Sequence, residues 1–473
     1  MERPGGDITT LLDLTPRDRQ DNDFFPLNTN NTWFTRDSAR RIIPATPLTA
    51  DFSFRGPAAF GQRFTFDIGS VPCGDLVFGA ALQIKLAHWL DATTLLHIQS
   101  GRYVYETPAE AWFYANSLGT SIIQKAELEI DGKTIEEIDG DFINVFSRLY
   151  CDLNTQLGLA GDMGVTATPL TWDPSRIYPT ENGVIHCPLP FFFMRTRLRE
   201  ALPMIAIKEG SMRIHITIRP FAECIRQLGG TRTTCSSTPL NSSITFIDTS
   251  FPFEQLVKIQ TSLSAPPLET VRLVTFGSLL DGKVREAMLR APFEIVHREV
   301  QTFYFTEPQK YIMSKNSAND TIRIALPLEA NHPLEEIVWF VRRKDGLNNE
   351  WTNYSDALEV SGRAPAPLLV TAEVQANGVT LCQSDEGYFR DLIARVHKGG
   401  VVPYTSFIYG YPFARHPGAH QPSGTLNASR VQNLRLVLEV KGAGGVEWEV
   451  KVFCLGINWL RFQNGMANAI FED

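Results

Sequence analysis

The chain has 473 residues, 20% of them charged, and a formal net charge of −8. This length exceeds the ~250–300 residues at which one hydrophobic core usually stops growing, so at least two domains are expected. The acidic balance argues against a surface built to neutralise phosphate, because nucleic-acid-binding surfaces carry clustered lysine and arginine in excess.

Segments that alternate or run apolar over five or more residues, and then stop at turn residues, are typical of β-strands. In chain order they include 62–68, 74–86, 126–130, 212–218, 271–280, 293–305, 321–328, 335–343, 368–374, 431–440 and 446–460. Helices are predicted at only 141–150, 283–291 and 385–396. Thirty phenylalanines add to the preference for sheet. The fold class is therefore all-β.

The clearest local structure is AELEIDGKTIEEI at 126–138, where Asp131-Gly132 separates two alternating runs. Asp-Gly readily adopts the positive φ angles of a type I′ turn, so a β-hairpin is predicted. The order strand, small-residue turn, strand and helix recurs around Asn377-Gly378. Such a duplicated unit among many short strands favours two sandwiches of the jelly-roll class.

Two stretches interrupt the strands. Gly, Ser, Thr and Pro crowd together at about 223–255, which predicts a polar surface insertion. DGKVREAMLRA at 281–291 predicts a helical connector between two strand-rich halves. Cys224 and Cys235 flank a polar loop within this insertion, and whether they pair stays open. The lack of a signal-peptide pattern at the N-terminus favours a reducing compartment.

The stretch CPLPFFFMRTRLREALPMIAI at 187–207 combines prolines, phenylalanines and arginines. Its apolar run is far shorter than the ~18–20 residues that a membrane span needs. We expect the phenylalanines to enter a sandwich and the prolines to lie at a sheet edge. If the following portion is extended, Arg195, Arg197 and Arg199 share one face, which predicts a charged barrel rim or a subunit interface.

Reactive groups form no coherent catalytic or metal set. His416 and His420 have i, i+4 spacing, but Pro417-Gly418 breaks any helix between them. Cys187 and His186 are adjacent in a strand and point to opposite faces. His215 alternates with isoleucines and is expected to face solvent or an interface. No catalytic, cofactor-binding or metal-binding residue is assigned.

Acidic residues gather between the predicted hairpin and helix, where a helix dipole favours negative charge, and a structural role is expected for them. They are Glu136, Glu137, Asp139 and Asp141. Sequons for N-glycosylation begin at Asn30, Asn241, Asn319, Asn353 and Asn427. Chance occurrence is the simpler interpretation of these five, with glycosylation outside the secretory route as the alternative.

Several of these segments together resemble the major capsid proteins of nucleocytoplasmic large DNA viruses, the group that includes iridovirus and algal-virus capsid proteins. The matching stretches follow the order of that family. They are 31–41 (NTWFTRDSARR), 59–77, 112–149, 187–221 (CPLPFFFMRTRLREALPMIAIKEGSMRIHITIRPF), 283–301, 420–440 and 457–471 (INWLRFQNGMANAIF). The resemblance departs at 223–255 and 345–366, which affects surface loops.

The resemblance implies two eight-stranded antiparallel jelly-roll β-sandwiches with a few short helices in connecting loops. The implied organisation is an extended arm at 1–49, a first jelly roll at 50–280, the connector at 281–291 and a second jelly roll at 292–473. The arm carries Phe24, Phe25, Trp33 and Phe34, and we expect it to pack beneath the barrels or on a neighbouring protein.

The function implied is that of a structural, non-enzymatic capsid protein without a cofactor. It would form a homotrimer of hexagonal outline that tiles an icosahedral virion shell, assembled in the host cytoplasm. Minor capsid and penton proteins are the expected partners, with an internal viral membrane nearby and no direct binding of nucleic acid. Any glycan on the sequons would then be added by virus-encoded enzymes. The alternatives are a minor capsid paralogue of the same fold and a twin-jelly-roll carbohydrate-binding protein or hydrolase.

Overall fold

The computed structural model describes the chain from Ala45 onward. Within 45–473, the ranges outside the description are 70–71, 89, 107–111, 166–182, 196–200, 208–210, 228–240, 254, 263–264, 307–320, 344–348, 358–363, 397–406, 420, 442–447, 464 and 471–473. The predicted packing of the N-terminal arm also lies outside the described residues. Residues 45–49, which the sequence assigned to the arm, belong to the first strand.

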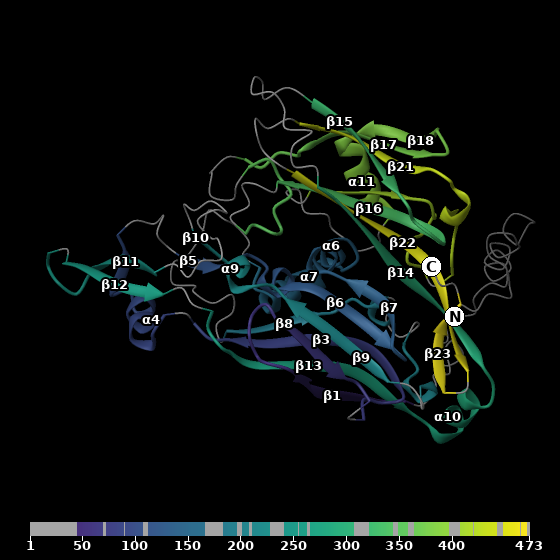
Figure 1. The fold of residues 1–473 in the computed structure, drawn as a ribbon, viewed down its shortest axis with the longest axis horizontal. Coiled ribbons are helices and arrows are strands. Elements are labelled where there is room, and N and C mark those ends of the chain that lie inside the picture. Colours follow the sequence, from purple (N-terminus) through teal and green to yellow (C-terminus); the bar gives the residue numbers. More distant parts are fainter. Residues whose placement is uncertain are drawn as a thin grey trace, which may run out of the picture. The chain divides into compact units, whose positions relative to one another are not determined.

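The first jelly roll consists of two four-stranded antiparallel sheets, ordered β1–β13–β3–β8 and β2–β9–β6–β7 (Figure 1). The strands are β1 (Ala45–Arg55), β2 (Arg63–Asp67), β3 (Leu76–Leu86), β6 (Ile123–Ile130), β7 (Lys133–Ile138), β8 (Val184–Pro188), β9 (Met212–Ile218) and β13 (Leu268–Leu280). Strand β1 joins the two sheets, since it pairs with β13 up to Ser53 and with β2 at Phe54 and Arg55.

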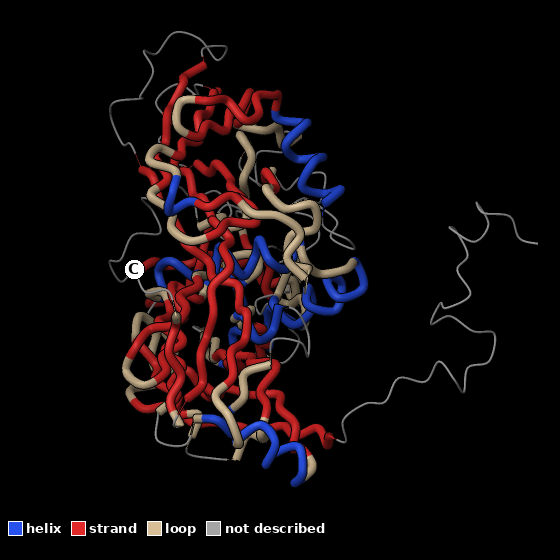
Figure 2. The backbone as a smooth tube through the Cα atoms, turned by 90° about the vertical axis from the view of Figure 1, so that its right-hand side faces the viewer, coloured by secondary structure: helices blue, strands red, loops and turns tan. Residues whose placement is uncertain are grey.

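The second jelly roll repeats this plan with the sheet orders β14–β22–β16–β19 and β15–β21–β17–β18. The strands are β14 (Phe293–Thr306), β15 (Thr321–Leu328), β16 (Pro333–Arg343), β17 (Leu369–Ala376), β18 (Val379–Asp385), β19 (Ile408–Pro412), β21 (Leu434–Lys441) and β22 (Trp448–Gln463). The short strands β20 (Leu426–Asn427) and β23 (Met466–Ala469) extend the first of these sheets. Strands dominate the chain in Figure 2, as the alternation in the sequence predicts.

Two smaller sheets lie outside the sandwiches. Strand β5 (Trp112–Tyr114) pairs with β10 (Ile225–Gln227), and β4 (Tyr103–Tyr105) pairs with β11 (Asn241–Asp248), which pairs with β12 (Gln255–Ser262). The prediction of a loop throughout 223–255 is therefore wrong for β10 and β11. The run from Thr245 to Asp248 alternates side chains between two faces, and its partner β4 lies far away in sequence, where a local pattern gives no signal.

The three predicted helices are confirmed as α6 (Gly140–Leu149), α10 (Gly282–Leu289) and α11 (Glu386–Val396). The structure adds α4 (Ala92–Gln99) and α7 (Leu153–Met163), which the sequence did not predict. Both carry an aspartate N-cap but little apolar contrast, and α7 buries only Met163. The remaining helical turns are α5 (Leu118–Ser121), α8 (Phe192–Arg195), α9 (Phe221–Cys224), η4 (Met204–Ala206) and η6 (Ala428–Arg430).

Both predicted hairpin turns are confirmed. The φ angles are 55° at Asp131 and 79° at Gly132, and 51° at Asn377 and 80° at Gly378. Positive values at both central residues define the type I′ turn, whose twist matches that of the flanking strands. Each turn is followed by a strand and then by a helix, α6 or α11, so the duplication seen in the sequence is present in the fold.

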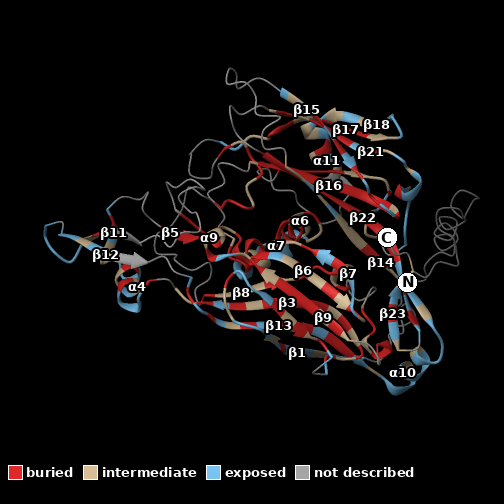
Figure 3. Ribbon diagram, in the orientation of Figure 1, coloured by how far each residue is buried: buried red, intermediate tan, exposed pale blue. Residues whose placement is uncertain are grey.

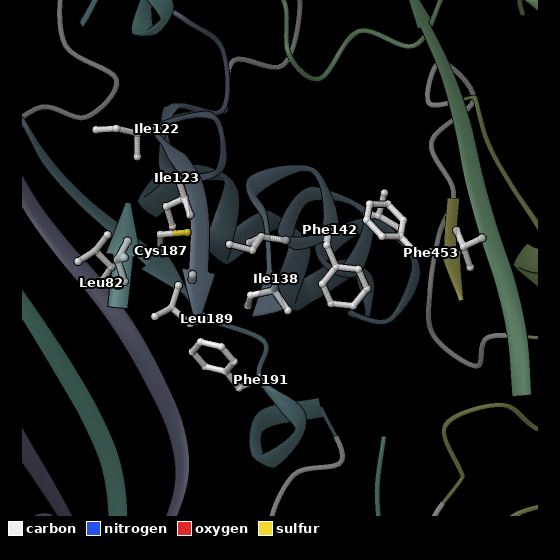
Figure 4. Packing of buried hydrophobic residues seen from close by; sticks show 14 of the residues in the cluster. Leu82, Ile122, Ile123, Ile138, Phe142, Cys187, Leu189, Phe191 and Phe453 are labelled. Carbon is white, nitrogen blue, oxygen red and sulfur yellow. The ribbon is translucent and has the colours of Figure 1, made fainter. Parts of the chain in front are cut away.

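The phenylalanines of the stretch 187–207 lie in the core. Phe191, Phe192 and Phe193 are fully buried, and Figure 4 shows Phe191 near Leu189 and below Ile138. Strand β8 pairs only with β3 and is an edge strand, as its prolines predict. The predicted extended continuation is wrong for 192–195, which forms α8: three consecutive phenylalanines are buried together more readily on a helical turn than on a strand that alternates faces.

Candidate functional site: a buried charge network between the jelly rolls

The acidic residues that follow the first hairpin meet cations of the second jelly roll. Asp141 Oδ1 accepts a hydrogen bond from Arg342 Nη1 at 2.7 Å, and its Oδ2 accepts one from Lys451 Nζ at 2.5 Å. Lys451 Nζ also donates to Asp139 Oδ2 at 2.7 Å, while the Asp139 Oδ1 atom caps α6 at the Phe142 amide. Helix α6 is thereby tied to β16 and β22.

Arg342 is the centre of this network. It donates from Nε to Glu449 Oε1 at 2.6 Å, and from Nη1 to the Trp351 carbonyl oxygen at 2.6 Å. The side chains of Arg342 and Asp141 are only 3% and 5% exposed. Two carboxylates and a carbonyl therefore satisfy a guanidinium that has almost no access to water, which is the condition under which a buried ion pair is tolerated.

The electrostatics of the network hold its groups ionised. Burial alone would raise the pKa of Asp141, but the positive charges of Arg342 and Lys451 outweigh burial and hold that pKa well below its usual range. Burial would lower the pKa of Arg342, and the charges of Asp141 and Glu449 raise it instead. Removing either Asp141 or Arg342 would leave an excess of the opposite charge in a buried environment of low dielectric constant.

A second group of charges lies where α8 approaches β14. Arg195 is paired with Glu136 of β7, and its Nη1 donates to the Arg298 carbonyl oxygen of β14 at 3.0 Å. Glu136 Oε2 also accepts the Phe192 amide at 2.7 Å. The side chain of Arg195 is 5% exposed, so it is not an exposed rim charge but a buried link between the two jelly rolls. Arg197 and Arg199 lie outside the described residues, so their predicted position stays a prediction.

Two consecutive glutamates of β16 also point inward. A register shift against β22 makes Glu335 a bulge residue, and Glu335 and Glu336 are each 1% exposed. Glu335 Oε2 accepts from Arg298 Nε at 2.7 Å, and Glu336 is bonded to the Tyr150 hydroxyl at the end of α6. The bulge re-aims a side chain that regular alternation would place on the other face of the strand.

Apolar and neutral contacts close the same boundary. Phe142 of α6 packs edge-on against Phe453 of β22, with ring centroids 5.3 Å apart, and Figure 4 shows the two facing each other. Asn144 Nδ2 donates to the Tyr354 hydroxyl at 2.8 Å. The Trp351 indole donates to the Glu223 carbonyl oxygen at 2.9 Å. Part of 345–366, expected to be surface loop, is therefore buried against the first jelly roll.

His297 of β14 is buried at this boundary without a charge partner that would favour its protonation. Burial, together with the positive charges of Arg195 and His332, lowers its pKa to about 3. Its ring lies 5.2 Å from that of Phe192, and no described residue bonds its Nδ1 atom. His297 is therefore neutral at physiological pH, and its protonation opposes folding.

The expectation for His215 needs correction. It is 8% exposed, because it lies on the central strand β9 between neighbours on both sides. Its Nδ1 lies 3.0 Å from Thr65 Oγ1 and its Nε2 lies 3.1 Å from Glu129 Oε2. Polar neighbours on the two flanking strands cover most of the imidazole, so it does not face solvent. Its expected position at an interface stays a prediction.

Two further candidate reactive groups, the Cys187–His186 pair and Cys224, lie in buried or paired positions. Cys187 is buried, which raises the pKa of its thiol strongly, and the adjacent His186 ring lies 3.4 Å from Gln83 in the next strand. Cys224 is a buried free thiol, and Cys235 lies outside the described residues. Within the described ranges, no cluster of three or more His, Cys, Asp or Glu could hold a metal ion. No helix in those ranges is long and apolar enough to cross a membrane.

The sequons differ in accessibility. Asn427 is exposed at the end of β20. Asn353 uses its amide nitrogen in bonds to Glu350 Oε2 at 2.7 Å and to the Ala357 carbonyl oxygen at 2.8 Å, and its sequon residue Ser355 is 2% exposed. Asn30 and Asn319 lie outside the described residues, and for Asn241 only the backbone of β11 is described.

The chain is similar in sequence to known viral capsid proteins. The sequence profile "Major capsid protein N-terminus" matches residues 32–254, and the profile "Large eukaryotic DNA virus major capsid protein" matches residues 285–468. The major capsid protein of Phaeocystis pouchetii virus is 24% identical, over 93% of this chain and 95% of its own length. That of Paramecium bursaria Chlorella virus 1 is 24% identical, over 68% of this chain and 67% of its own.

Solved structures carry the same fold. A quasi-atomic model of the PBCV-1 virus capsid matches with a TM-score of 0.67 at 16% identity, covering 92% of this chain and 98% of that one. The Faustovirus major capsid protein matches with a TM-score of 0.63 at 12% identity, covering 97% of each chain. The two profiles leave little of the chain unmatched, and both jelly rolls are present in full order. The chain belongs to the major capsid protein family of large eukaryotic DNA viruses.

Proposed function

We propose that this chain is a structural major capsid protein that forms a homotrimeric capsomer and tiles the icosahedral shell of a large DNA virus. The observation that carries the proposal is the buried charge network that ties α6 and α8 of the first jelly roll to the second. Two similar barrels held in a fixed relation behave as one rigid block. Three such blocks around a threefold axis place six barrels in a ring of nearly hexagonal outline.

The proposed division of the chain follows the sheets. Residues 45–280 form the first jelly roll, 281–291 the helical connector and 292–473 the second jelly roll. The exposed α10 lies between β13, the last strand of the first set, and β14, the first strand of the second. Residues 1–44 are the arm that, in this proposal, packs beneath the barrels or on a neighbouring protein during assembly.

The proposed role is non-enzymatic and needs no cofactor. The buried acidic residues described above are engaged by Arg195, Arg298, Arg342, Lys451 and the Tyr150 hydroxyl, which leaves them unsuited to act on a substrate. Proposed partners are copies of the chain itself, minor capsid proteins and penton proteins, in a virion shell close to an internal viral membrane. The acidic net charge speaks against direct packaging of the genome by this chain.

Light scattering coupled to size-exclusion chromatography tests the proposal. The expected mass is three times that of the 53.0 kDa chain, whereas a carbohydrate-active enzyme of the same fold is expected to elute as a monomer. Negative-stain images of the trimer fraction should show particles of hexagonal outline. A monomer at all concentrations would contradict the proposal. A minor capsid paralogue would differ from the proposed protein in having few copies per purified virion.

A further inference from the structure

The three-stranded sheet β12–β11–β4 presents a partly exposed row of apolar side chains on one face. Val104, Ile247 and Leu256 stand in register across the three strands. Val104 is 45% exposed and Leu256 53%, and Ile247 is half-buried. Alternation along each strand places these three side chains on one face.

The turn between β11 and β12 extends this surface with two phenylalanines. Phe251 is 51% exposed and Phe253 is 84% exposed, the highest value among the large apolar residues described as exposed. Figure 3 shows the turn as exposed, at the end of the described chain that lies away from β14 and β22. We call Val104, Ile247, Phe251, Phe253 and Leu256 the tip patch.

The tip patch is held in shape from behind. On the opposite face of the sheet, the Phe246 ring stacks on Tyr103 and packs at a tilt against Tyr105, with centroid distances of 5.9 Å and 4.8 Å. The centroid of the Tyr103 ring lies 4.7 Å from that of His97 of α4. Asp248 Oδ1 accepts from the Ser250 amide at 2.9 Å and fixes the start of the turn. Rigid display of aromatic side chains lowers the entropy lost on binding, which is typical of interface anchors.

We infer that the tip patch packs against a second copy of this chain within the capsomer, an inference that rests on the proposed function. A threefold ring needs a heterologous contact, in which one surface of a chain meets a different surface of the next. The described chain offers a second apolar surface on α7, where Leu153 and Leu157 are 52% and 66% exposed and stand one helical turn apart.

The size of the tip patch agrees with one contact among several. Its exposed side chains amount to roughly 400 Å², given about 200 Å² for a whole phenylalanine side chain. A stable interface needs roughly 800 Å² from each partner. The patch is therefore too small to hold an isolated pair of chains, and it gains its effect in a closed ring where each copy gives and receives one such contact.

The experiment combines two variants and a photo-cross-linker in the full-length chain. Phe251→Ser with Phe253→Ser should raise the chain concentration at which the trimer dissociates at least tenfold, measured by light scattering over a dilution series in mild urea. Val379→Ser is the matched control, because Val379 is 63% exposed on β18 of the other jelly roll and should leave that concentration unchanged.

A photoreactive amino acid at position 253 gives an independent readout that needs no destabilised variant. Cross-linking should give a product with twice the 53.0 kDa mass of the chain. A trimeric wild type whose double variant dissociates at the same concentration would overturn the inference and leave the proposed function standing. Cross-links formed only with an unrelated protein or with lipid would likewise overturn the inference and leave the proposed function standing. A wild type that is monomeric would overturn both.

Discussion

The most exacting test of the charge network is the replacement Arg342→Met. Methionine keeps a long apolar side chain beside Phe340 and Trp351 but removes the guanidinium that Asp141 and Glu449 face. Because both carboxylates are almost inaccessible to water, neither gains hydration in exchange. The variant therefore leaves Glu449 without its cation and Asp141 with Lys451 as its remaining cation, so negative charge is in excess between the two jelly rolls.

The magnitude follows from burial. Removing one partner of a buried ion pair costs about 3–5 kcal/mol of the free energy of unfolding. The pair Arg290–Glu286 on α10 is the matched control, since its side chains are 77% and 74% exposed at 3.8 Å. Removing an exposed pair of this kind costs about 0–1 kcal/mol. Asp141→Asn combined with Arg342→Met should cost less than the sum of the single changes, because the charges are coupled.

The assay is urea unfolding followed by tryptophan fluorescence, with transition midpoints compared among the wild type, Arg342→Met, Arg290→Ala and the double variant. A chain with two jelly rolls can unfold in two steps, so each step is fitted separately. We expect Arg342→Met to weaken the step in which the jelly rolls separate. A midpoint within experimental error of that of Arg290→Ala would refute the reasoning that this boundary depends on buried charge.

Three further outcomes are expected. The pKa of His297 is about 3 in the folded chain and about 6.5 in the unfolded chain, so the unfolded state binds the extra proton and stability falls as the pH drops below 6.5. In urea unfolding at both pH values, His297→Gln should therefore retain about 2–3 kcal/mol more of its pH 7.5 stability at pH 4.5 than the wild type does. Equal losses of stability in the two proteins would argue against this assignment. Gly140→Ala should destabilise the chain by about 3 kcal/mol or more in thermal unfolding, because a Cβ there would collide with the Thr120 carbonyl oxygen. Gly282 has open space around it at the start of α10, so Gly282→Ala should be neutral or stabilise by up to about 1 kcal/mol. Similar effects of the two substitutions would contradict the packing described. When the chain is expressed in a host with N-glycosylation, mass spectrometry should find glycan on the exposed Asn427 and none on Asn353, whose amide is bonded to Glu350 and Ala357. A glycan on Asn353 would mean that these two hydrogen bonds are absent when the sugar is added.

Local features of the fold could be predicted from the sequence, because they depend on neighbours along the chain. Alternation located β9 and β15 to the residue, and Asp131-Gly132 and Asn377-Gly378 located both type I′ turns. Helix α7 was missed because glycines and a single buried residue leave its sequence without an amphipathic pattern. The exposure of its leucines, Leu153 and Leu157, could not be predicted because it depends on the surrounding tertiary structure.

The sequence predicted the acidic residues of the candidate site but not their cationic partners. The acidic run ending at Asp141 indicated a structural role, but its partner Arg342 lies 201 residues further along the chain, where no local pattern can identify it. Arg195 was predicted at a barrel rim or subunit interface because alternation assumes a strand, and the helix α8 turns it toward Glu136. At both arginines, pairing with a carboxylate distant in sequence determines where the side chain lies. The position of each arginine next to apolar residues was the only feature of the sequence that indicated burial.

One measurement tests the central claim most directly: cryo-electron microscopy of the purified oligomer. The account predicts a particle of three 53.0 kDa chains with threefold symmetry, six barrels in a ring of nearly hexagonal outline, and the tip patch covered by a neighbouring copy. Single chains of 53.0 kDa with the two jelly rolls in variable relation would contradict it.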